Sequence, residues 1–379
     1  MRSVNFFSIK LLLGTVVLAI FIGIVFVYAN SEKAPIKPTK SFQIKQGINL
    51  NEWLEAGTLD SIRIDTLVTH EKILLLKELG FDHVRIPISE ANLFDENLNY
   101  RLNVKNILID RTDFCIKNGL KVIIDLHKTR NHTFEREDNQ LFESDLEIKK
   151  FLKIWEKLQN AFSNYSTDSL AYECLNEPAA PDKKHFLWNN VINPWISFIR
   201  EKEPKRVLFV GSNRGNQTWT FKYLDIPPND SNLVLTLHYY RPSLFTHYKA
   251  PWGKYAFYKG PIHYPGKLLT EEEYKQLPDS LQSKFQFTQE NYGKDYISKE
   301  VQTVVQFAQK YNLPINLGEF GCLRTMPDSL RYQWFKDIVD VMKEYNISYT
   351  LWGMNGAGFG IWDNKRNLDT LMLQTLKLK

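Results

Sequence analysis

The strongest constraint on the fold is a regular alternation of short apolar segments with amphipathic helical segments. We expect strands over residues 44–50, 81–87, 121–127, 170–175, 206–211, 233–240, 314–319 and 347–352. Helical spacing is found over residues 70–79, 104–117, 144–162, 182–202 (interrupted by Pro194), 297–311, 329–345 and 367–378, with only a short turn over 219–224. Eight strand–helix units in series favour a parallel sheet closed on itself. We therefore predict an α/β fold of the (β/α)8 (TIM) barrel type, with a single catalytic domain.

A long connection follows the sixth expected strand. Residues 241–293 are rich in Tyr, Phe, Pro and Lys and are too numerous for an ordinary loop, so we expect them to form a wall of a functional cleft. An open, doubly wound sheet would show the same alternation, but it would need a glycine-rich phosphate turn after a strand. The sequence has no G-x-G-x-x-G and no Walker motif, which favours the closed barrel.

Composition narrows the class of protein further. Of 379 residues, 43% are hydrophobic and 24% charged, as in globular proteins. The net charge is +5, and two of these charges, Arg2 and Lys10, lie near the N-terminus and leave +3 for the rest. No dense basic cluster is present, so we expect no nucleic-acid partner. Cys115, Cys174 and Cys322 form no C-x-x-C pair, and we interpret each as a buried apolar side chain.

The first 29 residues predict a targeting segment. Residues 11–29 carry no charge, and a run of this length is closer to a membrane span than to a signal-peptide core. Val27-Tyr28-Ala29 has the small-residue pattern of a cleavage site, so a membrane anchor and a cleaved signal peptide both stay open, with the anchor slightly favoured. In either case we expect the remainder to be exported. We divide the chain into a leader over 1–29, a linker over 30–41 and a catalytic domain over 42–379.

Polar side chains gather at the ends of the expected strands. The clearest case is Leu170-Ala-Tyr-Glu-Cys-Leu-Asn-Glu-Pro178, in which proline stops a buried strand directly after Asn176 and Glu177. The C-terminal strand ends of such a barrel share one rim, where active sites are built. The candidate set at this rim is Asn49, Arg85, His127, Asn176, Glu177, His238, Tyr240, Glu319 and Trp352. Because strands four and seven lie opposite each other, Glu177 and Glu319 should face each other, as acid-assisted cleavage of an acetal requires.

These residues also have structural interpretations, which the sequence leaves open. The two glutamates could be buried ion-pair partners of Arg85, and the histidines could be satisfied core residues. Asn49 could cap the following helix, and Trp352 could serve packing alone. No H-x-H or H-E-x-x-H spacing occurs, so we expect no catalytic metal and no cofactor.

The chain resembles the retaining glycoside hydrolases of family 5, the cellulase-type enzymes of the (β/α)8 clan. The matching segments are Gly47-Ile-Asn-Leu, Val84-Arg-Ile-Pro, Ile124-Asp-Leu-His, Leu175-Asn-Glu-Pro, His238-Tyr-Tyr, Leu317-Gly-Glu-Phe-Gly and Leu351-Trp, in the family's order over residues 47–352. Pro242-Ser-Leu-Phe-Thr-His247 with Trp252, and Gly356-Ala-Gly-Phe-Gly-Ile361, also look like bacterial members. One departure, Lys128-Thr-Arg130, would place cationic side chains at the rim.

The resemblance implies a double displacement by two carboxyls about 5 Å apart. Glu177 would be the acid/base with a raised pKa, and Glu319 the nucleophile, held and oriented by Arg85 and Tyr240. Asn176 would bind the sugar hydroxyl beside the anomeric carbon. The full set expected to bind or orient the substrate is Arg85, His127, Asn176, His238, Tyr240, Trp352 and Asn49.

These expectations lead to an exported, monomeric endo-β-1,4-glucanase acting on β-linked polysaccharides or oligosaccharides, with membrane contact through the N-terminal segment if it is uncleaved. Within the family, a β-mannanase, another β-glucanase and an exo-acting β-glucosidase stay open. From other classes, a catalytically inactive carbohydrate-binding barrel and a metal-dependent hydrolase also stay open.

Overall fold

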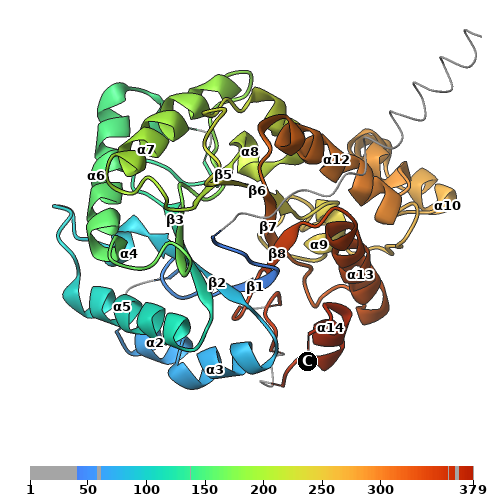
Figure 1. Ribbon diagram of the computed structural model, residues 1–379. Helices are drawn as coiled ribbons and strands as arrows, with labels where there is room; N and C mark the ends of the chain where they lie inside the picture. The colour runs from blue at the N-terminus through green and yellow to red at the C-terminus, as the bar shows by residue number, and fades with distance from the viewer. Residues whose placement is uncertain (1–40, 58–60, 137, 357, 363–366, 379) are drawn as a thin grey trace, which may run out of the picture. The chain divides into compact units, whose positions relative to one another are not determined.

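Eight parallel strands close into one barrel in the order in which they occur in the sequence (Figure 1). The computed structural model describes residues 41–57, 61–136, 138–356, 358–362 and 367–378. The strands are β1 (Gln46–Asn49), β2 (His83–Ser89), β3 (Lys121–Lys128), β4 (Leu170–Glu173), β5 (Leu208–Gly211), β6 (Leu233–Tyr239), β7 (Ile315–Phe320) and β8 (Ser348–Leu351). Ile48 pairs with Val84 on one side and with Leu351 on the other, which closes the ring. The predicted (β/α)8 barrel is confirmed.

Helices surround the strands (Figure 1). The α-helices are α2 (Ser61–Leu67), α3 (His70–Glu78), α4 (Glu90–Leu93), α5 (Leu102–Lys117), α6 (Asp145–Phe162), α7 (Asn189–Lys202), α8 (Asn213–Asn216), α9 (Ser243–Thr246), α10 (Glu271–Lys275), α11 (Asp279–Gln282), α12 (Lys294–Tyr311), α13 (Asp328–Glu344) and α14 (Thr370–Thr375). Short 3-10 helices are η1 (Gln140–Phe142), η2 (His185–Trp188), η3 (Thr218–Tyr223) and η4 (Ser283–Gln289). The sequence pattern did not predict α2 or α4, because each is too short to show helical periodicity.

The outer helices also fix the strand ends that lead to the rim. On α6, the buried side chains Phe151, Trp155, Leu158 and Phe162 recur at helical spacing and pack toward the barrel. Trp155 donates its indole N–H to the carbonyl of Cys174 at 3.0 Å, immediately after β4. A buried apolar face therefore anchors the segment that delivers Asn176 and Glu177 to the rim.

Most expected elements begin or end a few residues away from the observed ones, and two differences are instructive. The helix over 182–202 is not interrupted by Pro194, since α7 runs through it, and only 3-10 helix η2 precedes α7. Loss of one backbone donor is offset here because Val191, Ile192, Trp195 and Ile199 are buried along one face of the helix. Strand β4 ends at Glu173, two residues earlier than expected.

The long connection after β6 carries helices of its own, α9, α10, α11 and η4, of which α10 lies at the outer edge of the molecule in Figure 1. Leu268, Leu269 and Phe285 are fully buried in it and belong to the same hydrophobic core as the barrel strands. The three cysteines are buried and free, as predicted. Within the described residues, no helix is long and apolar enough to cross a membrane. The expected leader over 1–29 and almost all of the linker over 30–41 lie outside those residues.

Candidate active site

Arg85, on β2, is the centre of a buried network. Its Nε and Nη2 atoms donate to the two oxygens of Glu173 at 2.7 and 2.9 Å, a bidentate pair. Nη2 also lies 2.9 Å from Oδ2 of Asp125. Because these partners sit on β2, β4 and β3, the ion pairs hold the tips of three neighbouring strands in one arrangement. Both carboxylates and the guanidinium are almost fully buried.

The same guanidinium reaches three of the predicted site residues. Nη1 donates to Oε1 of Glu319 and to Oδ1 of Asn49, both at 2.8 Å, and Nη2 donates to Oδ1 of Asn176 at 2.9 Å. The Nδ2 group of Asn49 donates to the carbonyls of Gly318 and Leu351, so Asn49 ties β1 to β7 and β8 and does not cap a helix.

Glu319, at the tip of β7, is held from two sides. Besides Arg85, the hydroxyl of Tyr240 donates to its Oε2 at 3.1 Å. Nδ1 of His238 lies 3.6 Å from the same oxygen. One carboxylate oxygen therefore contacts the cation and the other faces the cavity with a phenol beside it.

Glu177 follows β4 and approaches from the opposite side. Its Oε1 lies 2.8 Å from Nδ1 of His238. The backbone of Glu177 has a φ of 32°, a left-handed conformation that residues other than glycine rarely adopt. Such strained residues concentrate at functional sites. The neighbouring Gly215 is so close that an added Cβ would lie 3.6 Å from the carboxyl carbon of Glu177.

Hydrogen bonds fix the tautomer of each site histidine. The amide nitrogen Nδ2 of Asn216 lies 3.3 Å from Nε2 of His238. Because an amide nitrogen donates, Nε2 accepts, and Nδ1 carries the hydrogen that faces Glu177. In His127, Nδ1 lies 2.7 Å from Oδ2 of Asp125 and donates to it. This leaves Nε2 of His127 as an acceptor. Burial lowers the pKa of both histidines, so both are neutral at pH 7.

Burial also dominates the acid–base chemistry of the two glutamates. It raises the pKa of Glu177 to about 7, with Arg85 acting in the opposite direction. It raises the pKa of Glu319 to about 7 as well, opposed by His238 and Arg85 and reinforced by Glu177. The two carboxyls therefore titrate as a coupled pair near neutral pH.

A cavity of about 530 Å³ opens above these groups. Its lining combines predicted residues with others, namely Asn51, Glu52, Glu55, Ala56, His127, Lys128, Phe134, Asn176, Glu177, Tyr240, His247, Trp252, Glu319, Trp352, Gly356 and Phe359. Trp352 stacks on His127, with ring centroids 5.6 Å apart and planes inclined by 11°. Arg85 and Asn49 lie beneath the lining.

Two cationic side chains lie at the end of β3 and just after it, Lys128 and Arg130, and they point to different places. Lys128 lines the cavity and pairs with Glu135 at 3.0 Å. Arg130 instead contacts Glu90 and, at 3.2 Å, Glu96. Only one of the two cations therefore reaches the site.

Three potential metal ligands come together here. One atom from each of Glu177, His238 and Glu319 lies within 4.8 Å of the others. Arg85 donates to Glu319 at 2.8 Å, and a resident cation beside Glu319 would face this buried positive charge. The donor set is therefore better suited to proton transfer than to holding a divalent metal.

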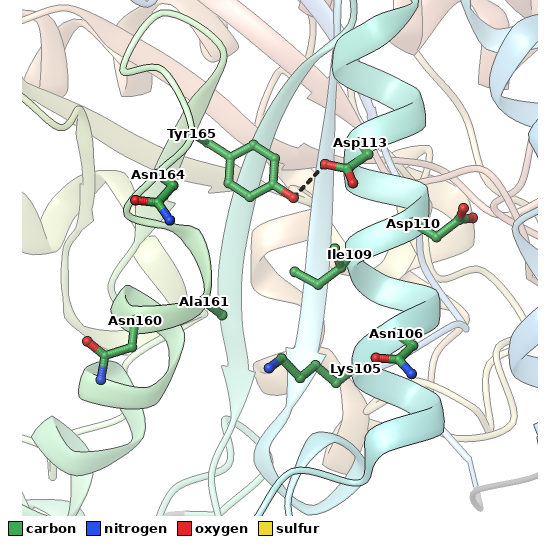
Figure 2. A pocket seen from close by; sticks show the side chains of 9 residues that line it. All are labelled: Lys105, Asn106, Ile109, Asp110, Asp113, Asn160, Ala161, Asn164 and Tyr165. Carbon is green, nitrogen blue, oxygen red and sulfur yellow. Dashed lines mark hydrogen bonds between the residues drawn. The ribbon is translucent and has the colours of Figure 1, made fainter.

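A larger hollow, of about 660 Å³, lies between α5 and the end of α6. Figure 2 shows its walls, where the hydroxyl of Tyr165 donates to Asp113 at 2.6 Å. The other lining residues are Lys105, Asn106, Ile109, Asp110, Asn160, Ala161 and Asn164, none of which is a predicted site residue. Size alone does not locate the site.

Sequence reasoning missed several residues that shape the site. Glu173 and Asn216 received no role, although a charge inside the apolar strand at 170–175 was a signal for Glu173. Asp125 has no role in the sequence analysis beyond its place in the matching segment Ile124-Asp-Leu-His, although it contacts both Arg85 and His127. His247 and Phe359 lie in two segments noted for their likeness to bacterial members, and both line the cavity.

A parallel eight-stranded barrel that presents two glutamates across one cavity at its C-terminal rim defines a hydrolase of the two-carboxylate glycosidase class. Comparison with known proteins narrows this class to one family. The profile of the family described as cellulase (glycosyl hydrolase family 5) matches residues 47–358, and the chain belongs to this family. The predicted family and the predicted enzyme class are confirmed.

The known proteins that the chain resembles in sequence include an endoglucanase and a cellodextrinase. Endoglucanase C of Acetivibrio thermocellus is 29% identical over 328 residues, covering 85% of this chain and 94% of the relative. Cellodextrinase A of Ruminococcus flavefaciens is 29% identical over 314 residues, covering 82% and 85%. Among solved structures, the cellulose synthase subunit Z of Clostridioides difficile has a TM-score of 0.71 and 28% identity, covering 88% of this chain and 99% of that one. A hyperthermophilic endo-β-1,4-glucanase in complex with substrate has a TM-score of 0.70 and 25% identity, covering 88% and 97%.

Proposed function

We propose that the protein is an endo-β-1,4-glucanase that retains anomeric configuration by double displacement. The observation that carries the mechanism is the separation of the two glutamates, since one atom from each lies within 4.8 Å of the other and of a His238 nitrogen. Retaining glycosidases place their carboxyls about 5–5.5 Å apart, whereas inverting enzymes need about 6.5–9.5 Å to admit a water.

Glu319 is the nucleophile and Glu177 the acid/base. Arg85 hydrogen-bonds Glu319 and acts on Glu177 only through its charge from a greater distance, so the negative charge of the pair is better stabilised on Glu319 and the shared proton resides on Glu177. In the first step an oxygen of Glu319 bonds to the anomeric carbon, the bond to the leaving oxygen breaks, and that oxygen takes the proton of Glu177. In the second step Glu177 takes a proton from water, which attacks the same carbon and releases Glu319.

The remaining side chains bind the sugar or hold the reacting groups. Asn176 uses its Oδ1 to accept from Arg85, which leaves its Nδ2 to donate to the hydroxyl beside the anomeric carbon. His127 offers Nε2 as an acceptor, and the ring of Trp352 forms the floor under the sugar. His238 and Tyr240 orient the carboxyls through their contacts at 2.8 and 3.1 Å. The contacts of Asn49 are all with the protein, so we assign it to positioning Arg85.

Two observations support internal cleavage of a polymer. The relatives include several named endoglucanases. In addition, a second hollow of about 280 Å³ shares Phe134 and Glu177 with the main cavity, so the cleft continues past the acid. We also propose that the enzyme acts outside the cytoplasm, because residues 11–29 have the composition of an export signal or anchor. A monomer is the oligomeric state that we propose for it.

The test is release of reducing ends from carboxymethyl-cellulose, soluble β-glucan, mannan, xyloglucan and xylan, with viscosity followed in parallel. Endo action predicts that viscosity falls well before many reducing ends appear. Glu177→Gln and Glu319→Gln should lose turnover, while Glu156→Gln, which changes an exposed carboxyl on α6 that lines neither hollow, should keep it. Chelator should have no effect. Preference for mannan, or loss of activity with chelator, would overturn the proposal.

A further inference from the structure

An ion pair lies at the mouth of the cleft, where β3 ends. Nζ of Lys128, the last residue of β3, lies 3.0 Å from Oε1 of Glu135 in the loop that follows. The Lys128 side chain is 25% exposed and the Glu135 side chain 59%, and an ion pair this open to water adds little to stability. Any larger effect of the pair must come from what its two charges do to neighbouring groups.

Contacts with Phe134 hold the positive end of the pair in place. Nζ of Lys128 lies 4.9 Å from the centroid of the Phe134 ring, a cation–π contact. Phe134 in turn meets His127 edge to face, with ring centroids 5.8 Å apart, and Asp125 fixes His127. The ammonium group is therefore tied to side chains that shape the site.

The two ends of the pair border two different hollows beside Glu177. Lys128 lines the main cavity of about 530 Å³, and Glu135 lines the second hollow of about 280 Å³. Phe134 and Glu177 line both hollows, whereas Glu319 lines only the main cavity of the two. The positive end of the pair therefore borders Glu177 on the side of the nucleophile, and the negative end borders it on the side away from the nucleophile.

The opposite charges of the pair act on Glu177 in opposite directions. A negative charge nearby makes a carboxyl harder to ionise, and a positive charge makes it easier. Burial has the largest influence on the pKa of Glu177 and raises it, and Arg85 comes next and lowers it; Glu135 follows and raises it, and Lys128 lowers it. Glu135 therefore favours the protonated form that donates to the leaving oxygen, and Lys128 favours the ionised form that takes a proton from water.

Other charged or titratable groups also surround Glu177. The strands and their ends contribute Arg85, Asp125, His127, His238, Tyr240 and Glu319. Glu52, Glu55 and His247 also line the main cavity, and Arg136 and Arg214 line the second hollow. All of these groups are the same in wild-type protein and in variants of the pair, so a difference between such proteins reports on Lys128 and Glu135.

We propose that Lys128 and Glu135 are positioning residues of the reaction, an ion pair that sets the proton affinity of Glu177 from the two hollows beside it. The inference rests on the proposed function, because it takes Glu177 as acid and then base. While the pair is intact, its two charges offset each other, and Glu177 serves in both steps. Removal of one charge moves the balance toward one form, ionised without Glu135 and protonated without Lys128.

The first test is the pH dependence of kcat/KM on cellohexaose, whose leaving group needs a proton. Glu135→Gln should move the alkaline limb to lower pH by about half a unit, and Lys128→Met should move it to higher pH by about as much. The double variant should return the limb to within about 0.2 unit of wild type, because both charges are then absent. Sodium chloride at about 0.5 M should shrink both single shifts.

A matched control and the contrary outcomes complete this test. Lys275→Met and Glu271→Gln change a lysine–glutamate pair on α10 that is 2.8 Å apart and lines neither hollow, and neither variant should move the limb. A purely structural pair predicts a fall in kcat in both single variants with the limb unmoved. That result, or limb shifts in the same direction in both single variants, would overturn the proposal. A rise in KM without a limb shift in Lys128→Met would overturn it too, and would make Lys128 a substrate-binding side chain.

The second test does not depend on the substrate. Glutamate side-chain carboxyls are labelled with carbon-13, and the NMR resonance that disappears in Glu177→Gln is that of Glu177. Its titration midpoint should move down in Glu135→Gln and up in Lys128→Met, even where hydrolysis proves to favour another polymer and the proposed function fails. Midpoints that stay within about 0.1 unit of wild type in both variants would overturn the role of the pair and leave the glucanase assignment intact.

Discussion

Arg85 donates one N–H to Glu319 at 2.8 Å, and both side chains are almost completely buried. The same guanidinium also contacts Glu173 and Asp125, so one cation compensates three buried carboxyls. A buried charge without a partner is costly, and this arrangement therefore couples the stability of the rim to the ionised form of the proposed nucleophile. Glu173 takes the Nε and Nη2 side of the planar fork, Asp125 shares Nη2, and Glu319 takes Nη1, an arrangement that a lysine cannot reproduce.

Arg85→Lys should lower both stability and activity. We expect loss of about 3–5 kcal/mol in the free energy of unfolding, because the bidentate pair with Glu173 and the contact with Glu319 cannot both be kept. We expect kcat to fall at least about a hundredfold, since Glu319 would lose its orientation and its charge stabilisation. Chemical denaturation and steady-state kinetics measure the two effects.

A second variant separates the two roles of Arg85. Glu173→Gln in the Arg85→Lys background should recover part of the stability, because it removes one uncompensated buried carboxylate. It should not recover kcat, which depends on Glu319. Recovery of both properties together would show that Arg85 acts only through folding.

The pH dependence of kcat/KM should be bell-shaped with its maximum near pH 7. Burial raises the pKa of both glutamates to about 7, so the acidic limb reports ionisation of the nucleophile and the alkaline limb loss of the proton on the acid. With a dinitrophenyl cellobioside, whose leaving group needs no proton, Glu177→Gln should keep glycosylation rates near wild type and lose the alkaline limb. An alkaline limb that persists in this variant would assign it to another group.

Glu177→Gln should stabilise the fold more at pH 8 than at pH 4.5. Burial raises the pKa of Glu177 from 4.5 to about 7, so the folded state binds this proton more tightly than the unfolded state, and stability falls as pH rises between those values. The amide avoids this cost and can still accept from His238. We expect a gain of about 1–3 kcal/mol above pH 7 that vanishes below about pH 4.5. Thermal unfolding of both proteins across this range is the measurement, and a gain independent of pH would contradict it.

Asn216→Gly should shift the alkaline limb to higher pH. Asn216 adopts a left-handed φ of 55°, so glycine keeps the backbone while removing the donor to Nε2 of His238. His238 can then carry its hydrogen on Nε2 and accept from protonated Glu177, which raises the pKa of that acid. Gly211→Ala should act alike, because a Cβ there would lie 1.9 Å from Oδ1 of Asn216. Unchanged pH profiles in both variants would show that the tautomer does not matter.

The barrel could be predicted because its signal is periodic and repeated. Each buried strand reads as an apolar run, and each outer helix repeats its apolar face, as Trp155 and Phe162 do on α6. The expectations that were wrong concern features decided by tertiary packing. Pro194 is tolerated within α7 because Trp195 and its neighbours are buried, and a local rule for proline carries no information about that burial.

The rim residues could be predicted because strand ends in a barrel share one face, whatever their separation in sequence. The side chains that bind these rim residues could not be predicted. Glu173 on β4 binds Arg85 on β2, past the intervening strand β3, and Asn216 reaches His238 from a left-handed turn after β5. Both contacts depend on side-chain directions that alternate along a strand or are set by a loop, and neither follows from spacing in the sequence.

In the proposed mechanism, Glu319 attacks the anomeric carbon while Glu177 serves as acid and then base. The most direct measurement is proton NMR of the first products formed from cellohexaose by the wild-type enzyme, recorded before mutarotation. Double displacement predicts that the β anomer appears first and the α anomer grows in only as mutarotation proceeds. The α anomer appearing first would mean inversion by a single displacement, and the roles assigned to Glu177 and Glu319 would have to be abandoned.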